Sequence, residues 1–165
     1  MKKLFAFVVL ASLASFLVAE EKKAVAKKPA AAKMEHKVMA PGDMQWGDPP
    51  PVFPAGAKMA VLAGDPGKAG PFTLRLKVPD GFKVASHWHP TAENLTVISG
   101  EFHLGVGDKL DESQAKTMAA GSFATMPARM HHYAWTKGET EVQVHGMGPF
   151  KLIYVNPADD PSKKK

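Results

Sequence analysis

The chain of 165 residues contains no cysteine. This absence excludes a lipid-modified cysteine, structural disulfides and thiolate metal sites together. The sequence also lacks a sustained apolar repeat at helical spacing and any internal repeat, which argues against a helical bundle and against a repeat array. The length suits one domain with a proper core, whereas two domains would each have too few residues.

Positive charge is scarce in the body of the chain, although the formal net charge is +5. Residues 1–40 carry eight lysines against three glutamates, and the last three residues are all lysine. Between residues 41 and 162, ten basic residues stand against thirteen acidic ones. The lysines therefore belong to the two tails, and a basic face for nucleic acid is not expected.

The only long apolar run lies at the start of the chain. Two lysines precede the apolar stretch from Leu4 to Val18, and Ala19 stands just before the charges of Glu20 and Glu21. This pattern predicts a secretory signal peptide over residues 1–19, because the run is short for a membrane span. An uncleaved anchor is the alternative. We expect a periplasmic or secreted protein with no stable membrane span after cleavage.

The next two segments differ from the rest in composition. Residues 20–40 are rich in Lys, Ala and Pro, which predicts a disordered, flexible spacer. Residues 41–56 are rich in Pro and Gly, and we expect an extended arm anchored by Trp46 and Phe53 that could pair two copies in a homodimer. The domain is then expected to span residues 41–160, followed by a basic tail at 161–165.

The remaining sequence reads as short strands separated by turn residues. The stretch "PFTLRLKVP", residues 71–79, alternates apolar and polar side chains with a period of two. The segments "FKVASHWH", "NLTVIS", "EFHLGVG", "SFATMP", "HHYAWT", "EVQVHGMG" and "FKLIYVN" follow, each bounded by Gly, Pro, Asp or Asn. Eight or more short strands predict an all-β fold, an antiparallel sandwich or barrel.

Two spaced motifs stand out in this frame. The first places Gly81, His87, His89, Glu93 and Gly100 in the pattern G-x5-H-x-H-x3-E-x6-G. Side chains alternate along a strand, so the two histidines face the same way, and Pro90 ends the strand so that a corner can return the glutamate to that side. The second motif runs from Gly121 through Pro127 to His132.

These motifs resemble the two motifs of the cupin superfamily over roughly residues 72–156. The resemblance implies a double-stranded β-helix, or jelly-roll barrel, with one metal ion held by His87, His89, Glu93 and His132. The second motif departs from the family pattern, with Arg129 where glycine is usual and Thr136 where asparagine often lies. Only one of two neighbouring strand residues can enter the barrel, and the family spacing selects His132 over His131.

Three imidazole nitrogens and one carboxylate oxygen suit a divalent transition metal ion, with copper, nickel, zinc, iron and manganese as the choices. We expect apolar side chains to form the wall of the cavity. The candidates for this wall are Phe72, Leu74, Leu95, Val97, Phe123 and Ala134.

The expected function is a metal-dependent oxidoreductase, oxygenase-like, acting on a small oxygenated molecule, with Glu93 also the catalytic group that takes a proton. The alternatives are a redox-neutral Lewis-acid isomerase or lyase, and a protein that binds a metal or small ligand without turnover. An isomerase or lyase needs a further acid or base. The sequence offers Arg75, Lys77, His103 and His131 for that role.

Overall fold

The structure is a computed structural model that describes residues 36–164. The predicted signal peptide, most of the predicted spacer and Lys165 lie outside the described residues. Within residues 36–164, no helix has the length and apolar character that a membrane crossing requires.

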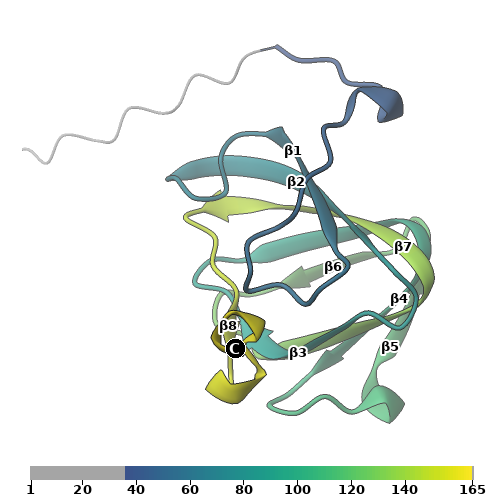
Figure 1. Cartoon of the computed structure of the whole chain (residues 1–165), viewed down its shortest axis with the longest axis vertical. Helices are drawn as coiled ribbons and strands as arrows, with labels where there is room; N and C mark the ends of the chain where they lie inside the picture. The colour runs from purple at the N-terminus through teal and green to yellow at the C-terminus, as the bar shows by residue number, and fades with distance from the viewer. Residues whose placement is uncertain (1–35, 165) are drawn as a thin grey trace, which may run out of the picture. The chain divides into compact units, whose positions relative to one another are not determined.

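The regular structure of residues 36–164 consists of antiparallel strands and a few short 3-10 turns (Figure 1). The strands are β1 (Lys58–Ala63), β2 (Gly70–Val78), β3 (Lys83–Trp88), β4 (Glu93–Val106), β5 (Lys116–Ala119), β6 (Phe123–Met126), β7 (His132–Gly148) and β8 (Ile153–Tyr154). Four single 3-10 turns complete the described elements: η1 (Pro41–Asp43), η2 (Glu112–Gln114), η3 (Pro157–Asp159) and η4 (Pro161–Lys163). The predicted all-β class is confirmed.

Two long strands, β4 and β7, join two layers of strands. In one layer, β1, β2, the second half of β7, the first half of β4 and β6 pair in that order. In the other layer, the order is β8, β3, the first half of β7, the second half of β4 and β5. Figure 1 shows β1 and β2 on one side and β3, β5 and β8 on the other. This is the two-layered arrangement of a jelly roll.

The sequence segments expected to be separate strands are continuous in β4 and in β7. Gly100 and Gly138, which were expected to end strands, lie inside these strands with φ of 83° and 74°. The register of β4 against β7 shifts between Val97 and Glu101. The glycines therefore bend the two strands from one layer into the other instead of ending them.

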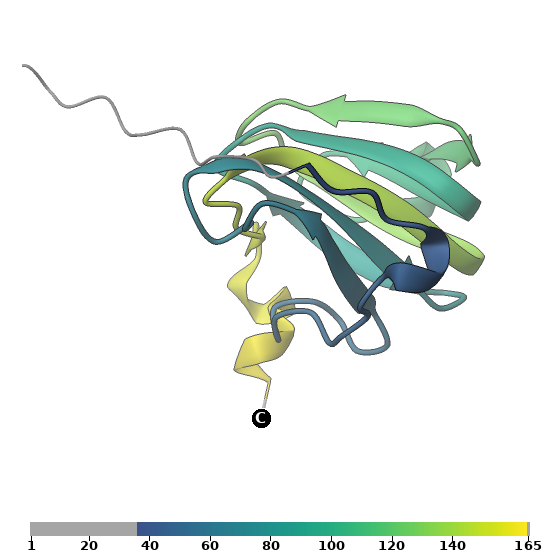
Figure 2. The same cartoon turned by 90° about the horizontal axis from the view of Figure 1, so that it is seen from above.

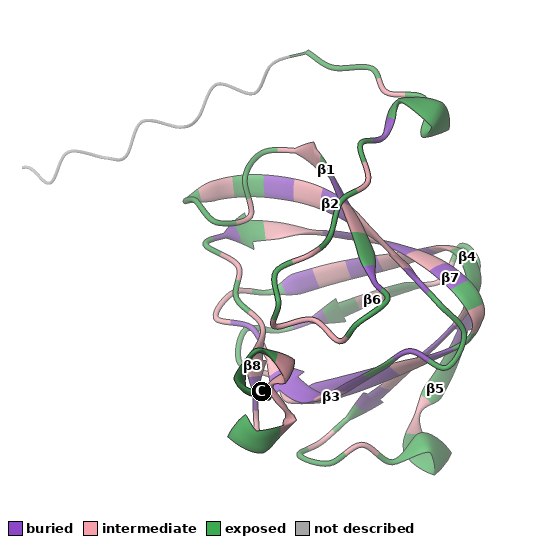
Figure 3. Ribbon diagram, viewed as in Figure 1, coloured by how far each residue is buried: buried purple, intermediate pink, exposed green. Residues whose placement is uncertain are grey.

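The inner faces of the two layers form the core. Along β2, Phe72, Leu74 and Val78 are buried, whereas Thr73, Arg75 and Lys77 are partly exposed, as the predicted period of two requires. Leu76, on the inner face, is also partly exposed. Figure 3 shows this alternation as bands along the strand. Burial of each such side chain stabilises the fold by about 1.5–3 kcal/mol.

The segment before β1 is the predicted arm, and it runs beside β1 (Figure 2). Gly47 and Met59 exchange backbone hydrogen bonds, with N···O distances of 2.9 and 2.8 Å. The Trp46 ring packs under the ammonium group of Lys77, 4.7 Å from the ring centroid. Trp46 thus anchors the arm, as expected from the sequence.

Arg129, which departs from the glycine of the cupin pattern, adopts the backbone conformation that glycine would favour. Its φ is 65°, and its backbone N–H donates to the carbonyl of His89 at 2.8 Å. The left-handed conformation costs an ordinary residue about 1–2 kcal/mol. The turn therefore has the backbone conformation expected for glycine at this position, although Arg129 makes that conformation less favourable.

Gly100 and Gly81 form a matched pair for testing the bend in β4. Both have positive φ, but a Cβ on Gly100 would lie 2.5 Å from the carbonyl oxygen of Glu139, whereas a Cβ on Gly81 would meet no atom within 4 Å. We expect Gly81→Ala to cost about 1 kcal/mol and Gly100→Ala about 2–4 kcal/mol, because the latter adds a backbone clash. Urea unfolding of both variants measures this, and equal losses would contradict the close approach.

Candidate metal centre

The four residues of the predicted site come from three strands and meet between the two layers. His87 lies near the end of β3, His89 follows that strand, Glu93 begins β4, and His132 begins β7. His87 and His132 are direct partners in the antiparallel pairing of β3 and β7. All four are buried, with exposed fractions of 5%, 3%, 7% and 2% in chain order.

The side chains converge on one point. Ring nitrogens of His87, His89 and His132 all lie within 4.8 Å of one another, the spacing of a site that could hold a metal ion. The Oε2 atom of Glu93 lies 3.3 Å from Nε2 of His89 and 3.2 Å from Nε2 of His132. The structure thus brings together every residue that the two motifs selected for the site.

Backbone carbonyls fix the orientation of all three imidazole rings. The Nδ1 atom of each histidine lies 2.8–2.9 Å from a carbonyl oxygen, which can only accept a hydrogen bond. The acceptors are Ala85 for His87, Lys151 for His89 and Met130 for His132. Each Nδ1 therefore carries a hydrogen, and in the neutral ring each Nε2 keeps a free lone pair. This orientation of the ring is typical of metal-binding histidines.

Electrostatics keep these groups in the forms that a metal needs. Burial, with the neighbouring His132 and His89, lowers the pKa of His87 to about 3, so its imidazole is neutral near pH 7. Burial alone would raise the pKa of Glu93, but the adjacent rings of His132 and His89 outweigh burial and hold that pKa below its ordinary value. Glu93 is therefore an anion near the neutral ring of His87.

The site fits a divalent metal ion. The Nε2 atom of His89 is buried without a hydrogen-bond partner, although it lies close to the carboxylate of Glu93. Two lone-pair atoms in contact repel each other unless a cation lies between them, and a buried unpaired group is costly. The donor set is three imidazole nitrogens and one carboxylate oxygen. Such a set matches first-row transition metals and leaves coordination positions open.

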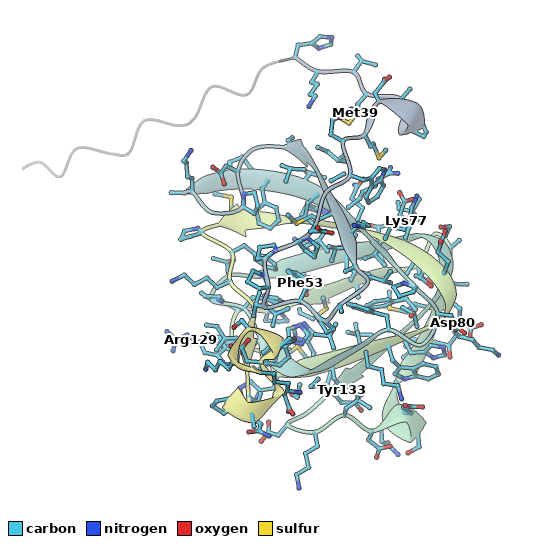
Figure 4. All side chains as sticks on the ribbon, viewed as in Figure 1. Met39, Phe53, Lys77, Asp80, Arg129 and Tyr133 are labelled. Carbon is cyan, nitrogen blue, oxygen red and sulfur yellow. The ribbon has the colours of Figure 1, made fainter. Side chains whose placement is uncertain are left out.

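A cavity of about 430 Å³ extends from this cluster between the two layers. Its wall includes Leu74, Leu76, Leu95, Phe102, Leu104 and Ala134, and its rim includes Val52 and Phe53 of the arm. Figure 4 shows Phe53 on the arm, in front of the space between the layers. The volume is within the range of about 300–1,000 Å³ that small-molecule sites occupy.

Comparison with known proteins identifies the family. The family model described as a domain of unknown function, DUF4437, matches residues 11–153. The chain belongs to the DUF4437 family. No curated protein matches it significantly.

Solved structures show that this DUF4437 chain has the cupin fold. The polyketide cyclase RemF from Streptomyces resistomycificus is 15% identical with a TM-score of 0.65, over 77% of this chain and 90% of the cyclase. A candidate acetylacetone dioxygenase from Methylibium petroleiphilum is 20% identical with a TM-score of 0.59, over 79% and 88%. An RmlC-like cupin from Shewanella frigidimarina is 17% identical with a TM-score of 0.55, over 70% and 94%.

The neighbouring histidines of the DUF4437 chain have other surroundings. His131 is partly exposed, and its Nδ1 pairs with Asp108 at 2.6 Å. His103 is buried on the outer side of β4, where its ring stacks on Trp135 with centroids 3.6 Å apart. Neither lines the cavity. His132 is thus the member of the His131–His132 pair that joins the cluster.

The prediction that Phe123 lines the cavity was wrong. Phe123 is 58% exposed, because β6 pairs with β4 in a register that turns Ala124 and Met126 inward and Phe123 outward. Leu74, Leu95 and Ala134 do line the cavity. Of the expected wall, Phe72 and Val97 are buried in the core nearby without lining the cavity.

The segment that contacts His89, around Phe150, was not predicted from the sequence. Phe150 stacks on the His89 ring, with centroids 4.2 Å apart and planes 16° apart, and the next residue supplies the carbonyl for Nδ1. A carbonyl acceptor leaves no trace in side-chain identity, and Phe150 belongs to neither motif. Only the aromatic residue next to the predicted last strand could have hinted at this contact.

The buried neutral imidazole of His87 makes the metal-free protein sensitive to acid. The unfolded chain binds a proton at this ring below about pH 6.5, whereas the folded protein does so only near a pKa of about 3. Unfolding therefore takes up a proton between these values, and stability present above pH 6.5 is lost as the pH falls.

We expect metal-free protein to be about 2 kcal/mol less stable at pH 5 than at pH 7.5 from this ring alone. Urea unfolding at both pH values measures the loss. His87→Asn should reduce the loss, while His145→Asn, a change at a partly exposed ring outside the cavity, should leave it unchanged. A pH dependence that His87→Asn leaves intact would contradict the assignment.

Proposed function

We propose that this cupin binds one divalent transition metal ion through His87, His89, Glu93 and His132, and acts as a metal-dependent oxidoreductase of the oxygenase type on a small oxygenated organic molecule. The observation that carries the proposal is the arrangement of the three histidines, whose Nδ1–H groups are all used by backbone carbonyls. Their Nε2 lone pairs converge beside a carboxylate and need a cation to hold them together.

The protein side of the chemistry can be assigned to named groups. A bound metal would supply redox and Lewis-acid chemistry at this end of the cavity. The apolar wall would exclude water from the bound substrate. Among residues 36–164, Glu93 supplies the one carboxylate that lines the cavity, so it is the group placed to accept a proton from the substrate.

The surroundings of the other acid and base candidates favour an oxidoreductase over an isomerase or lyase. Arg75 donates to Glu141 at 2.7 Å and to Gln143 at 3.2 Å on the outer face of β7. Lys77 lies over Trp46. Neither residue lines the cavity, nor do His103 and His131. Apart from the three clustered histidines, Glu93 is then the acid or base that the described cavity lining offers for proton transfer.

The similar structures support the fold and leave the chemistry open. One is named as a cyclase and another as a candidate dioxygenase, and both share the barrel. A fold hosts several functions, so the proposal stands on the site. Export by the predicted signal peptide stays a prediction, and it would expose the site to the metals available outside the cytoplasm.

Replacement of neighbouring histidines tests the ligand set. His132→Ala removes one of the converging nitrogens and should weaken zinc binding by at least about 100-fold, while His131→Ala should change it by less than about twofold. Competition titration with a chromophoric chelator measures both affinities, and circular dichroism checks that both variants fold. Equal affinities in the two variants would overturn the ligand assignment.

Oxygen consumption tests the reaction class. Protein loaded with iron, copper, nickel or manganese should consume dioxygen with at least one member of a panel of enols, diketones and diols, and zinc-loaded protein should not, because zinc has no redox chemistry. Glu93→Gln should abolish the consumption, and Glu101→Gln, which lies outside the cavity, should preserve it. Conversion of the same compounds by zinc-loaded protein without dioxygen would favour the redox-neutral alternative.

A further inference from the structure

The polar groups that line the cavity gather at one end. The histidine cluster and Glu93 form that end, and the wall beyond it is aliphatic and aromatic. One layer contributes Leu74, Leu76 and Leu95, and the other contributes Phe102, Leu104 and Ala134. A ligand that reaches the cluster must therefore bury the rest of its surface against hydrocarbon.

The remaining polar side chains of the lining are bonded elsewhere, directed away from the cavity or exposed at its rim. The Thr136 hydroxyl donates to the carbonyl of Pro79 at 2.9 Å. The Nε1–H of Trp135 has no hydrogen-bond partner, but its ring stacks on His103, on the face of β4 opposite to the cavity-lining Phe102 and Leu104. The Lys151 side chain is exposed at the rim. A hydroxyl group on the ligand body would lose its hydrogen bonds to water and gain none, which costs several kcal/mol in general.

Charge sets a second limit on the ligand. A divalent ion coordinated by three imidazoles, which bind a metal in their neutral form, and by the Glu93 carboxylate would leave one net positive charge in a buried place. A ligand group with one negative charge would balance it. A second negative charge would be buried without a partner, since the described lining offers no cation except the exposed Lys151.

We propose that this cavity selects molecules with a single monoanionic oxygen-donor group on an otherwise apolar body, an inference that rests on the proposed metal site. Enols and acidic phenols or diketones with hydrocarbon substituents belong to this class. Sugars and other polyhydroxylated compounds do not, because the wall has no partners for their hydroxyl groups.

A series of hydroxamic acids tests the proposal, because each member binds a metal through the same pair of oxygens. The probe is cobalt-loaded protein, and the readout is the cobalt absorption band. From acetohydroxamic to octanohydroxamic acid, we expect the affinity to rise about fourfold for each methylene until the cavity is full. Gluconohydroxamic acid, with a polyhydroxylated tail, should bind no more tightly than acetohydroxamic acid.

Variants of the cavity wall separate the contribution of the hydrocarbon tail to affinity from the contribution of the metal ion. Ala134→Leu, which fills part of the cavity, and Leu104→Asn, which makes the wall polar, should each weaken octanohydroxamic acid by about tenfold or more and change acetohydroxamic acid by less than about twofold. Val106→Asn is the control, because Val106 lies on the same strand but is 60% exposed. Leu104 is itself partly exposed, so Leu104→Asn keeps the test available if the larger side chain at position 134 prevents folding.

The outcomes distinguish the two proposals. Cobalt binding with a spectral response to acetohydroxamic acid but no dependence on tail length, or a preference for the polyhydroxylated tail, would overturn the ligand class and leave the metal site standing. Failure of the wild-type protein to bind cobalt would overturn the metal site and the ligand class with it.

Discussion

Three buried imidazole nitrogens and one carboxylate oxygen meet at one end of the cavity between the two layers of this cupin fold. The Nδ1–H of each histidine donates to a backbone carbonyl, so the Nε2 atoms that face one another carry lone pairs in the neutral rings. Such a cluster is unfavourable on its own and becomes favourable around a cation. Burial explains why His87 stays neutral, and the contact with Glu93 supplies the negative charge that a metal would need.

The two long strands of the barrel hold this cluster in place. The strands that begin at Glu93 and His132 are the two long ones, and each crosses from one layer to the other. Gly100 permits the crossing because the neighbouring strand approaches too closely for a side chain. The pairing of the whole sheet thereby fixes the strand ends that carry the ligands. The arm and the segment around Phe150 line the opening of the cavity. A rigid scaffold positions the site, and short segments shape its opening.

The sequence predicted the centre of the site better than its surroundings. The spacing from Gly81 to Gly100 selected three residues that meet in space, because strand alternation and a corner at Pro90 are local rules. Strand limits were less predictable, since a glycine can bend a strand as well as end it, as Gly100 shows. Phe123 was misplaced because its orientation depends on the register of an edge strand. The carbonyl acceptors could not be foreseen, because any residue supplies one.

We propose that the histidine cluster is a metal site made by three imidazoles and one carboxylate. X-ray absorption of zinc-loaded protein tests this ligand set, since the scattering pattern counts imidazole ligands and distinguishes them from water. We expect three imidazole nitrogens at about 2.0–2.1 Å from the zinc ion, with at least one oxygen at a similar distance. A spectrum with one imidazole or none, as expected for zinc bound loosely at the surface, would contradict it.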